Sequence, residues 1–411
     1  MSHSFSANTG LFDCRASPEH LARYAQLVRE ERTAAVRTVF GTVFFGADAG
    51  NAGGVGYMAC GTSSGAISIF NLATVLRRKQ RQQRACENIG DGSGEGDGDG
   101  DGDGDGDAGP TLVIPAHTGA VYSLVVYDAG GGDPMLCSSG EDGRTLLWRV
   151  PDLVAAADGG SGQSKAGAGG GLTPAGSYAN PQACLTRGAL GPVPETTALA
   201  PDTRRGVLLA AAGDGVCYGW DVGEGRAAPI MRLQGHADAL HCVTARVGCG
   251  QAVTGSEDGT ARIWDCRAET CTQVIDVWRA KEAGAGASAG AWVGCVALDK
   301  DENWLAMGCG GRCITTWSFA AGACVSRVAT AAAPQALVLA GEHLVAAGAE
   351  AAVYRWNLSG QVVSRQLCTP RSVFALGMQP HGRGLTAVAG AGACVDLFSE
   401  LGSRVCKVTC A

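Results

Sequence analysis

Short apolar and alternating segments recur along the chain and are separated by glycine-rich turns. The pattern is clearest over residues 235–265, GHADALHCVTARVGCGQAVTGSEDGTARIWD. A Gly-His pair is followed by an apolar segment, then by a small-residue segment ending in a turn at Asp258-Gly259, and then by an alternating segment closed by Trp264. Because alternation with a period of two is typical of β-strands, this unit predicts short antiparallel strands. It recurs at residues 117–148, HTGAVYSLVVYDAGGGDPMLCSSGEDGRTLLW.

Weaker copies of the unit also end at an aromatic residue. In total, seven aromatic residues close a unit: Phe70, Trp148, Trp220, Trp264, Trp317, Trp356 and Phe398. Their spacings are 78, 72, 44, 53, 39 and 42 residues. The first two spacings fall near 44 when inserts of roughly 34 residues (77–110) and roughly 28 residues (153–180) are removed. A propeller blade typically takes about 40–45 residues, so seven anchors predict seven blades.

The predicted fold is therefore all-β, a seven-bladed β-propeller over residues 36–411. A four-stranded sheet is too thin to bury both of its faces alone, and radial stacking of neighbouring sheets covers them. Residues 404–409 are expected to form the outer strand of the last blade, and residues 111–116 that of the first. The ring would then close without exchanging strands between its ends.

Other segments are expected to lie outside the propeller. Residues 1–16 are expected to be flexible, and residues 17–35 to form a short helix, since Ser17 suits an N-cap, Pro18 a first helical position, and apolar residues follow at helical spacing. This helix would lie on the rim or dock a partner. The insert at 77–110, basic and then Gly/Asp-rich, and the Gly/Ala-rich insert at 153–181 are expected to be disordered because such sequences bury little.

Composition agrees with many tight turns, since glycine supplies 63 of 411 residues and only 17% are charged. The net charge of −7 is concentrated in eight acids between residues 91 and 107; without them, 31 acids face 32 Lys and Arg. Bulk charge thus predicts neither an acidic-substrate enzyme nor a whole-domain grip on nucleic acid. The 18 cysteines are scattered through apolar segments, which favours buried thiols in a reducing compartment. No long apolar run or signal-like start is seen, so a soluble chain without membrane contact is expected.

These residues resemble the WD40-repeat family over nearly the whole chain. In that family, His, Ser/Thr, Asp and Trp form a hydrogen-bonded tetrad within a blade, and two repeats match it in full. The matching residues are His117, Ser138, Asp142 and Trp148 in the second repeat, and His236, Thr254, Asp258 and Trp264 in the fourth. Trp220 keeps Asp214 but has Ala210 at the hydroxyl position, where the other four repeats have Cys60, Met307, Ala346 and Val388.

A buried His beside Asp and Ser or Thr also resembles a hydrolase triad. The structural interpretation is favoured, because the same set recurs in separate blades and no G-x-S-x-G turn is present. We therefore expect no enzyme, no catalytic residue, no cofactor and no small-molecule substrate. No metal site is expected either, since the Cys309/Cys313 and Cys406/Cys410 spacings lack the further Cys or His pair typical of zinc.

The first insert raises two further possibilities. Its DGDGDGD run resembles a calcium loop but has no acid at the twelfth position of any register, which disfavours calcium binding. Its five basic residues could contact RNA phosphate, but they lie beside an acidic run and lack interleaved aromatics. Internal charge balance is therefore favoured over RNA contact. These basic residues are Arg77, Arg78, Lys79, Arg81 and Arg84.

The C-terminal half carries a narrower resemblance. TGSEDGTARIWDCR, WVGCVALDKDENWLAMGCGGRCITTWSF, AAGAEAAVYRWNLSG and AVAGAGACVDLFSELGSRVCKV resemble the THO complex subunit 6 family, and VGYMACGTSSGAISIFNL and PAHTGAVYSLVV fit it as well. The two long inserts depart from that family. The resemblance implies a nuclear, non-catalytic scaffold in the THO part of the TREX machinery, acting in mRNA processing and export. It implies docking to coiled-coil THO subunits, with RNA contact mainly indirect.

A second functional class is also open. Asp258, Trp264, Asp265 and Arg267 match the W-D-x-R box of WD40 substrate receptors in cullin-4 ubiquitin ligases. In that class, the Arg contacts the adaptor. Asp258 and Trp264 already serve the tetrad, and an Asp-x-Arg pair after the Trp is common in ordinary repeats. The exposure of Arg267 distinguishes an adaptor-binding box from an ordinary repeat, because an Arg267 buried in an ion pair within the blade could not contact the adaptor.

Overall fold

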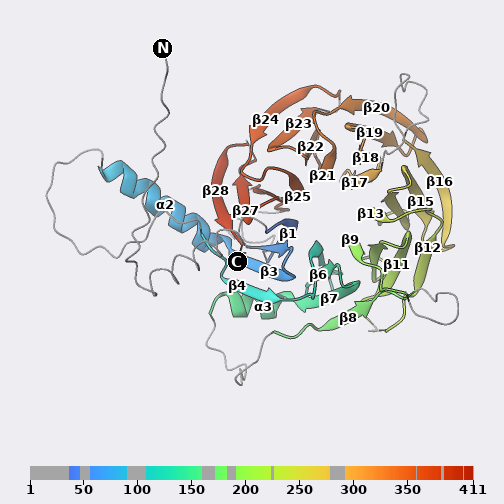
Figure 1. Cartoon of the computed structure of the whole chain (residues 1–411), viewed down its shortest axis with the longest axis horizontal. Helices are drawn as coiled ribbons and strands as arrows, with labels where there is room; N and C mark the ends of the chain where they lie inside the picture. The colour runs from blue at the N-terminus through green and yellow to red at the C-terminus, as the bar shows by residue number, and fades with distance from the viewer. Residues whose placement is uncertain are drawn as a thin grey trace, which may run out of the picture.

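The chain forms a closed ring of β-sheets in a computed structural model (Figure 1). The structure describes residues 37–46, 56–89, 108–159, 172–182, 191–223, 226–277, 292–357, 359–380, 384–400 and 402–410, with side chains of the second segment described to residue 81. Over these ranges, seven four-stranded antiparallel sheets surround a central axis. The predicted seven-bladed, all-β propeller is confirmed.

Each blade consists of four strands consecutive in sequence. Blades 1 to 4 contain, from the axis outward, β1 (Val39–Phe45), β2 (Tyr57–Thr62), β3 (Ala66–Asn71) and β4 (Leu112–Pro115); β5 (Val121–Tyr127), β6 (Met135–Gly140), β7 (Arg144–Arg149) and β8 (Gly176–Ala179); β9 (Thr196–Asp202), β10 (Val207–Ala212), β11 (Val216–Asp221) and β12 (Met231–Gln234); β13 (Leu240–Arg246), β14 (Gln251–Ser256), β15 (Thr260–Asp265) and β16 (Thr270–Asp276).

The remaining three blades follow the same order. Blades 5 to 7 contain β17 (Val293–Leu298), β18 (Trp304–Cys309), β19 (Cys313–Ser318) and β20 (Ala323–Ala329); β21 (Pro334–Ala340), β22 (His343–Gly348), β23 (Ala352–Asn357) and β24 (Val362–Leu367); β25 (Val373–Met378), β26 (Thr386–Gly390), β27 (Cys394–Phe398) and β28 (Arg404–Thr409).

The aromatic anchors explain why these segments stack as blades. All seven lie on the third strand of a blade and are buried. The second strands are the most buried elements, and every residue of β2 and β10 is inside. Outer strands such as β20 instead alternate between exposed and half-buried positions. Sheets sandwiched between neighbours thus read as continuously apolar, whereas the rim strands keep one face in solvent.

The ring closes as expected. β4 pairs with β3 in the first blade, and β28 pairs with β27 in the last, so the two blades exchange no strands. Ala108, just before β4, instead forms a parallel bridge to Val408 of β28, and Thr38 bridges to Ala391. Single bridges therefore fasten the start of the ring to its end.

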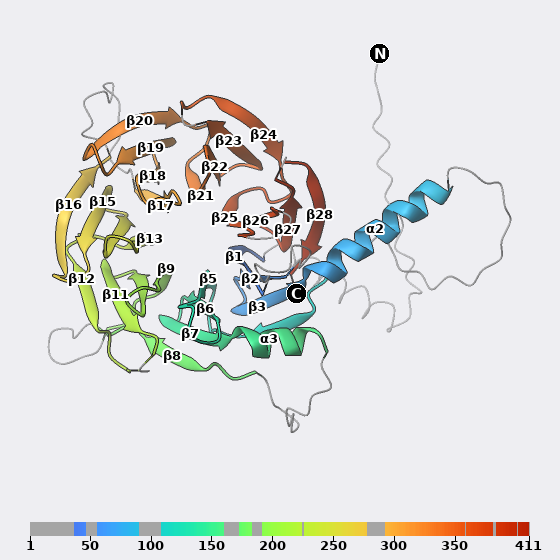
Figure 2. The same cartoon turned by 180° about the vertical axis from the view of Figure 1, so that it is seen from behind.

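The structure corrects the expectation that residues 77–110 are wholly disordered. Helix α2 (Leu72–Ile89) includes the basic part of this insert and extends outward from the edge of the ring (Figure 2). Leu72, Val75 and Leu76 recur at helical spacing and are buried against blades 1 and 7. The Arg, Lys and Gln residues that follow favour helix. The basic run therefore continues a helix that the core has already anchored.

The insert at 153–181 also contains structure. Helix α3 (Val150–Ala157) begins before it, with Pro151 in the first turn and with Val150 and Leu153 buried. β8 lies near its end, where buried Tyr178 stacks on Trp220 with ring centroids 5.2 Å apart. Apolar anchors at both ends thus order segments whose composition resembles a linker. The predictions of a flexible segment at 1–16, of a helix at 17–35 and of disorder in the Gly-Asp repeat fall on residues outside the described ranges.

In the part of the chain that the structure describes, no helix is long and apolar enough to cross a membrane. The strand cysteines Cys60, Cys137, Cys217, Cys242 and Cys295 are all buried. Burial raises the pKa of the Cys137 thiol to about 12, which keeps it protonated at neutral pH.

Candidate protein-docking site

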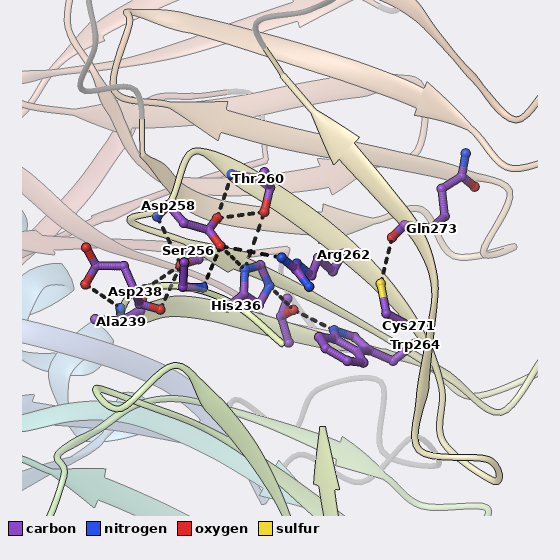
Figure 3. A network of polar contacts seen from close by, with 12 residues as sticks. His236, Asp238, Ala239, Ser256, Asp258, Thr260, Arg262, Trp264, Cys271 and Gln273 are labelled. Carbon is purple, nitrogen blue, oxygen red and sulfur yellow. Dashed lines mark hydrogen bonds and ion pairs between the residues drawn. The ribbon is translucent and has the colours of Figure 1, made fainter. Parts of the chain in front are cut away.

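Four residues of blade 4 form a connected polar network (Figure 3). The imidazole of His236 lies in the loop before β13, with Nδ1 2.8 Å from Oδ2 of Asp258 and Nε2 2.8 Å from Oγ1 of Thr254. The indole N–H of Trp264 donates to the same Oγ1 at 2.8 Å. The network joins the loop, β14, the turn after it and β15.

Burial and hydrogen bonding set the charges of this network. Burial alone would raise the pKa of Asp258, but hydrogen bonds from Thr260, His236 and two backbone amides outweigh it and hold the pKa at about 2. Burial lowers the pKa of His236 below its usual value, against the opposing effect of Asp258. A carboxylate therefore faces a neutral imidazole at neutral pH.

Blade 2 repeats this arrangement with similar distances. Nδ1 of His117 lies 2.9 Å from Asp142, and Nε2 lies 2.9 Å from the Ser138 hydroxyl. The indole N–H of Trp148 donates to the same hydroxyl at 3.1 Å. The His117 and His236 side chains have no exposed surface, so neither reaches a substrate. This arrangement fixes strands relative to one another and provides no accessible base or nucleophile.

Blade 3 uses a different partner for its Asp. The hydroxyl of Tyr218 donates to Oδ2 of Asp214 at 2.6 Å, in place of a histidine. With Ala210 at the hydroxyl position, the buried indole N–H of Trp220 has no hydrogen-bond partner among the described residues. The Trp317 N–H of blade 5 is likewise without one within the described ranges. In blades 3 and 5, packing therefore holds the Trp of the third strand without a hydrogen bond from its indole N–H.

The tetrad predicts acid destabilisation. The pKa of His236 is lower in the folded chain than the ordinary 6.5, so the unfolded chain takes up a proton first as the pH falls. The difference between the two pKa values therefore leaves the fold at full stability above pH 6.5. Stability is lost as the pH falls from 6.5 toward the lower pKa that His236 has in the folded chain. Asp258, with a pKa of about 2 against 3.8, adds stability that is lost below about pH 4.

The test compares urea unfolding midpoints of the wild type and His236→Gln between about pH 7.5 and about pH 5.5. The wild type should lose stability over this interval, and the variant should show a smaller slope. His343→Gln, outside both tetrads, should keep the wild-type slope. An unchanged slope in His236→Gln would contradict the assignment.

The W-D-x-R box lies at the end of β15. Trp264 is 1% exposed and Asp258 nearly buried, so the box presents only Asp265 and Arg267 at the surface. The Asp265 carboxylate accepts the backbone N–H of Arg267 at 2.8 Å. The Arg267 side chain is exposed and makes no ion pair with any residue that the structure describes. The guanidinium therefore remains accessible.

Exposed apolar side chains lie on the outer strands of blades 5 and 6. Val325 of β20 and Val363 and Leu367 of β24 are 55%, 53% and 68% exposed. Val325 and Val363 are each the extra residue of a β-bulge opposite the Trp of the third strand. Because they occupy the same position of neighbouring blades, they lie at one level of the ring. We call these residues, with Val362, the apolar rim.

Sequence reasoning did not find the apolar rim or Tyr218. The alternation of β20 and β24 signals two-faced strands, but not which face lacks a neighbour. Tyr218 follows Asp214 by four residues across a tight turn, and this spacing is the only signal for its substitution of histidine.

Comparison with known proteins agrees with this geometry. The family model for the WD domain, G-beta repeat, matches residues 227–265, which contain the complete tetrad of blade 4. The seven blades and the tetrads thus define a WD40-repeat β-propeller.

Similar proteins show to which family of WD40-repeat proteins the chain belongs. The chain is 36% identical over 299 residues to THO complex subunit 6 of Arabidopsis thaliana, a match that covers 73% of this chain and 77% of that protein. It is 26% identical over 361 residues to THO complex subunit 6 of Homo sapiens, covering 85% and 87%. With the Drosophila melanogaster protein of that name, it shares 33% identity over 120 residues, covering 29% and 32%. The chain belongs to the THO complex subunit 6 family.

Proposed function

We propose that this chain is a non-catalytic scaffold subunit of a nuclear THO/TREX assembly, acting in mRNP assembly, mRNA processing and mRNA export by docking other proteins. The observation that carries this proposal is the 36% identity to THO complex subunit 6 over most of both chains. The geometry supports it, because a rigid ring with buried tetrads and exposed rim side chains suits binding rather than chemistry.

In this proposal, the apolar rim receives helices of coiled-coil THO subunits, and RNA is bound mainly by those partners. Val325 and Val363 are exposed at equal positions of two neighbouring blades, and Leu367 adds a third exposed aliphatic side chain at the other end of β24. Burying these side chains against a partner would stabilise the complex by about 25 cal/mol for each Å² of apolar surface removed from water. Exposed Arg365 lies between Val363 and Leu367 on the same strand, where its Nε donates to the Tyr354 hydroxyl at 2.9 Å, and its aliphatic stem would pack beside the two apolar side chains.

The experiment measures capture of purified THO subunits by the immobilised chain. Val363→Glu with Leu367→Glu should weaken capture at least about tenfold, since carboxylates would enter an apolar contact. Val113→Glu, at an exposed valine on the outer strand of blade 1, is the matched control and should bind as the wild type does. Equal capture by the double variant would exclude the rim, and no capture by the wild type would contradict the proposed function.

The exposed guanidinium of Arg267 supports a second candidate function, a substrate receptor of a cullin-4 ubiquitin ligase. Adaptor binding would use Asp265 and Arg267, since Asp258 and Trp264 are occupied within the blade. Arg267→Ala should abolish capture of the adaptor, whereas Arg149→Ala, at an exposed arginine ending the third strand of blade 2, should not. Unchanged capture by Arg267→Ala would count against this function.

A further inference from the structure

The second residue of every innermost strand is displaced from the regular ladder. In each of the seven blades, the register between the first two strands skips this residue, which makes it the extra residue of a β-bulge. Bulges re-aim a side chain away from its usual direction. All seven bulged residues line one cavity at the central axis: Phe40, Tyr122, Thr197, His241, Gly294, Gln335 and Phe374.

This cavity, which we call the channel mouth, has a volume of about 480 Å³. One side is aromatic. The ring of Phe40 meets that of Tyr122 edge-on, with centroids 5.4 Å apart, and the centroid of the Phe374 ring lies 5.5 Å from that of Phe40. These side chains are half-buried, so part of each ring surface faces the opening. The volume and the aromatic wall are typical of a ligand site.

The other side of the channel mouth is acidic. Glu195 and Glu257 line it, and the described residues of the lining include no Lys or Arg. The Glu257 carboxylate pairs with His241, whose ring meets Trp292 edge-on with centroids 5.7 Å apart. The half-buried Glu195 carboxylate has no hydrogen-bond or ion-pair partner among the described residues.

An unsatisfied acceptor adds an independent observation. The side-chain oxygen of Gln335 is buried at the channel mouth and accepts no hydrogen bond within the described part of the chain. A buried polar atom without a partner costs about 1–3 kcal/mol. A donor entering the cavity would satisfy it. Aromatic surfaces, two carboxylates and an amide oxygen together favour one kind of ligand, a cation that donates hydrogen bonds.

We propose that the channel mouth binds the cationic side chain of an arginine or lysine in an extended peptide of a partner protein. The charged group would lie between the Glu195 and Glu257 carboxylates and donate to Gln335. Its aliphatic stem would pack on Phe40 and Tyr122. This site goes beyond the proposed function, because it is separate from the apolar rim.

The channel mouth also lies on the opposite face from Arg267. Consecutive strands of a blade are antiparallel, so the start of β13 and the turn after β14 share one face, and the end of β15 lies on the other. His241 and Glu257 belong to the first face, whereas Arg267 follows β15 on the second. Binding at the two places can therefore be measured separately.

The test uses the purified chain and fluorescein-labelled pools of degenerate octapeptides with a fixed central Arg, Lys, Gln or Glu. Fluorescence anisotropy should show binding of the Arg or Lys pool at least about tenfold tighter than that of the Gln and Glu pools. Binding should weaken as salt is added, since the carboxylates are partly exposed. Equal binding of the four pools would overturn the proposal.

Variants locate the site. Glu195→Gln with Glu257→Gln should reduce the preference for Arg or Lys over Gln at least about fivefold. Glu342→Gln, at an exposed glutamate outside the cavity, should leave it unchanged. Tyr122→Ala should weaken binding, whereas Tyr122→Phe, which keeps the ring face, should restore it. Thermal unfolding checks that each variant is folded. A folded Glu195→Gln/Glu257→Gln chain with undiminished preference would also overturn the proposal.

Discussion

Replacing Trp264 by alanine is expected to destabilise the protein by about 3–5 kcal/mol. The side chain is 1% exposed and packs within the core between blades 3 and 4. Its removal leaves a cavity and also deletes the donor to the Thr254 hydroxyl. The measurement is the shift in the urea unfolding midpoint at pH 7, with the slope of the transition compared to confirm similar cooperativity.

Two milder variants separate packing from hydrogen bonding. Trp264→Phe loses the indole N–H that donates to Thr254, whereas Trp220→Phe removes a buried N–H that has no partner in the described structure. Both side chains are almost fully enclosed, so the loss of volume is matched. Trp264→Phe should therefore cost at least about 1 kcal/mol more than Trp220→Phe. Equal or reversed costs would contradict the structural role given to the tetrad.

The second large effect concerns the glycines opposite the bulges. A Cβ added at Gly390 would lie 1.8 Å from the Ser372 carbonyl oxygen, and one added at Gly348 would lie 1.9 Å from that of Ala333. These carbonyl groups cannot move without disturbing the neighbouring bulges, which direct Phe374 and Gln335 toward the central axis. Gly390→Ala should therefore destabilise by about 1–3 kcal/mol.

Gly132→Ala is the matched control, because an added Cβ there meets no atom within 4 Å. This substitution should change the stability by less than about 0.5 kcal/mol. Thermal or urea unfolding of both variants decides the matter. Equal stability of Gly390→Ala and Gly132→Ala would contradict the close contact between residue 390 and the Ser372 carbonyl oxygen.

The repeat was predictable because the aromatic anchors are local and regular. Trp148 and Trp264 each follow an Asp by six residues and a hydroxyl residue by ten, so the tetrads could be placed without knowing the fold. Helix α2 was missed because its basic part resembles a solvated linker, and its order depends on Leu72 and Val75 packing on distant blades.

The channel mouth could not be found from sequence. Its bulges are defined by pairing with a second strand, and its seven bulged residues come from seven blades spread over more than 300 residues. Phe40 and Phe374 are neighbours only because the ring closes. Exposure of Arg267 and of the apolar rim likewise depends on which neighbour covers each strand end, and the local pattern does not record that.

Affinity purification of the tagged chain from nuclear extract, with quantitative mass spectrometry, tests membership of a THO assembly most directly. Other THO subunits should be enriched in comparable molar amounts, and their recovery should survive nuclease treatment, since the proposed contacts are between proteins. Recovery of no THO subunit above an untagged control, or of a cullin-4 adaptor in their place, would contradict it.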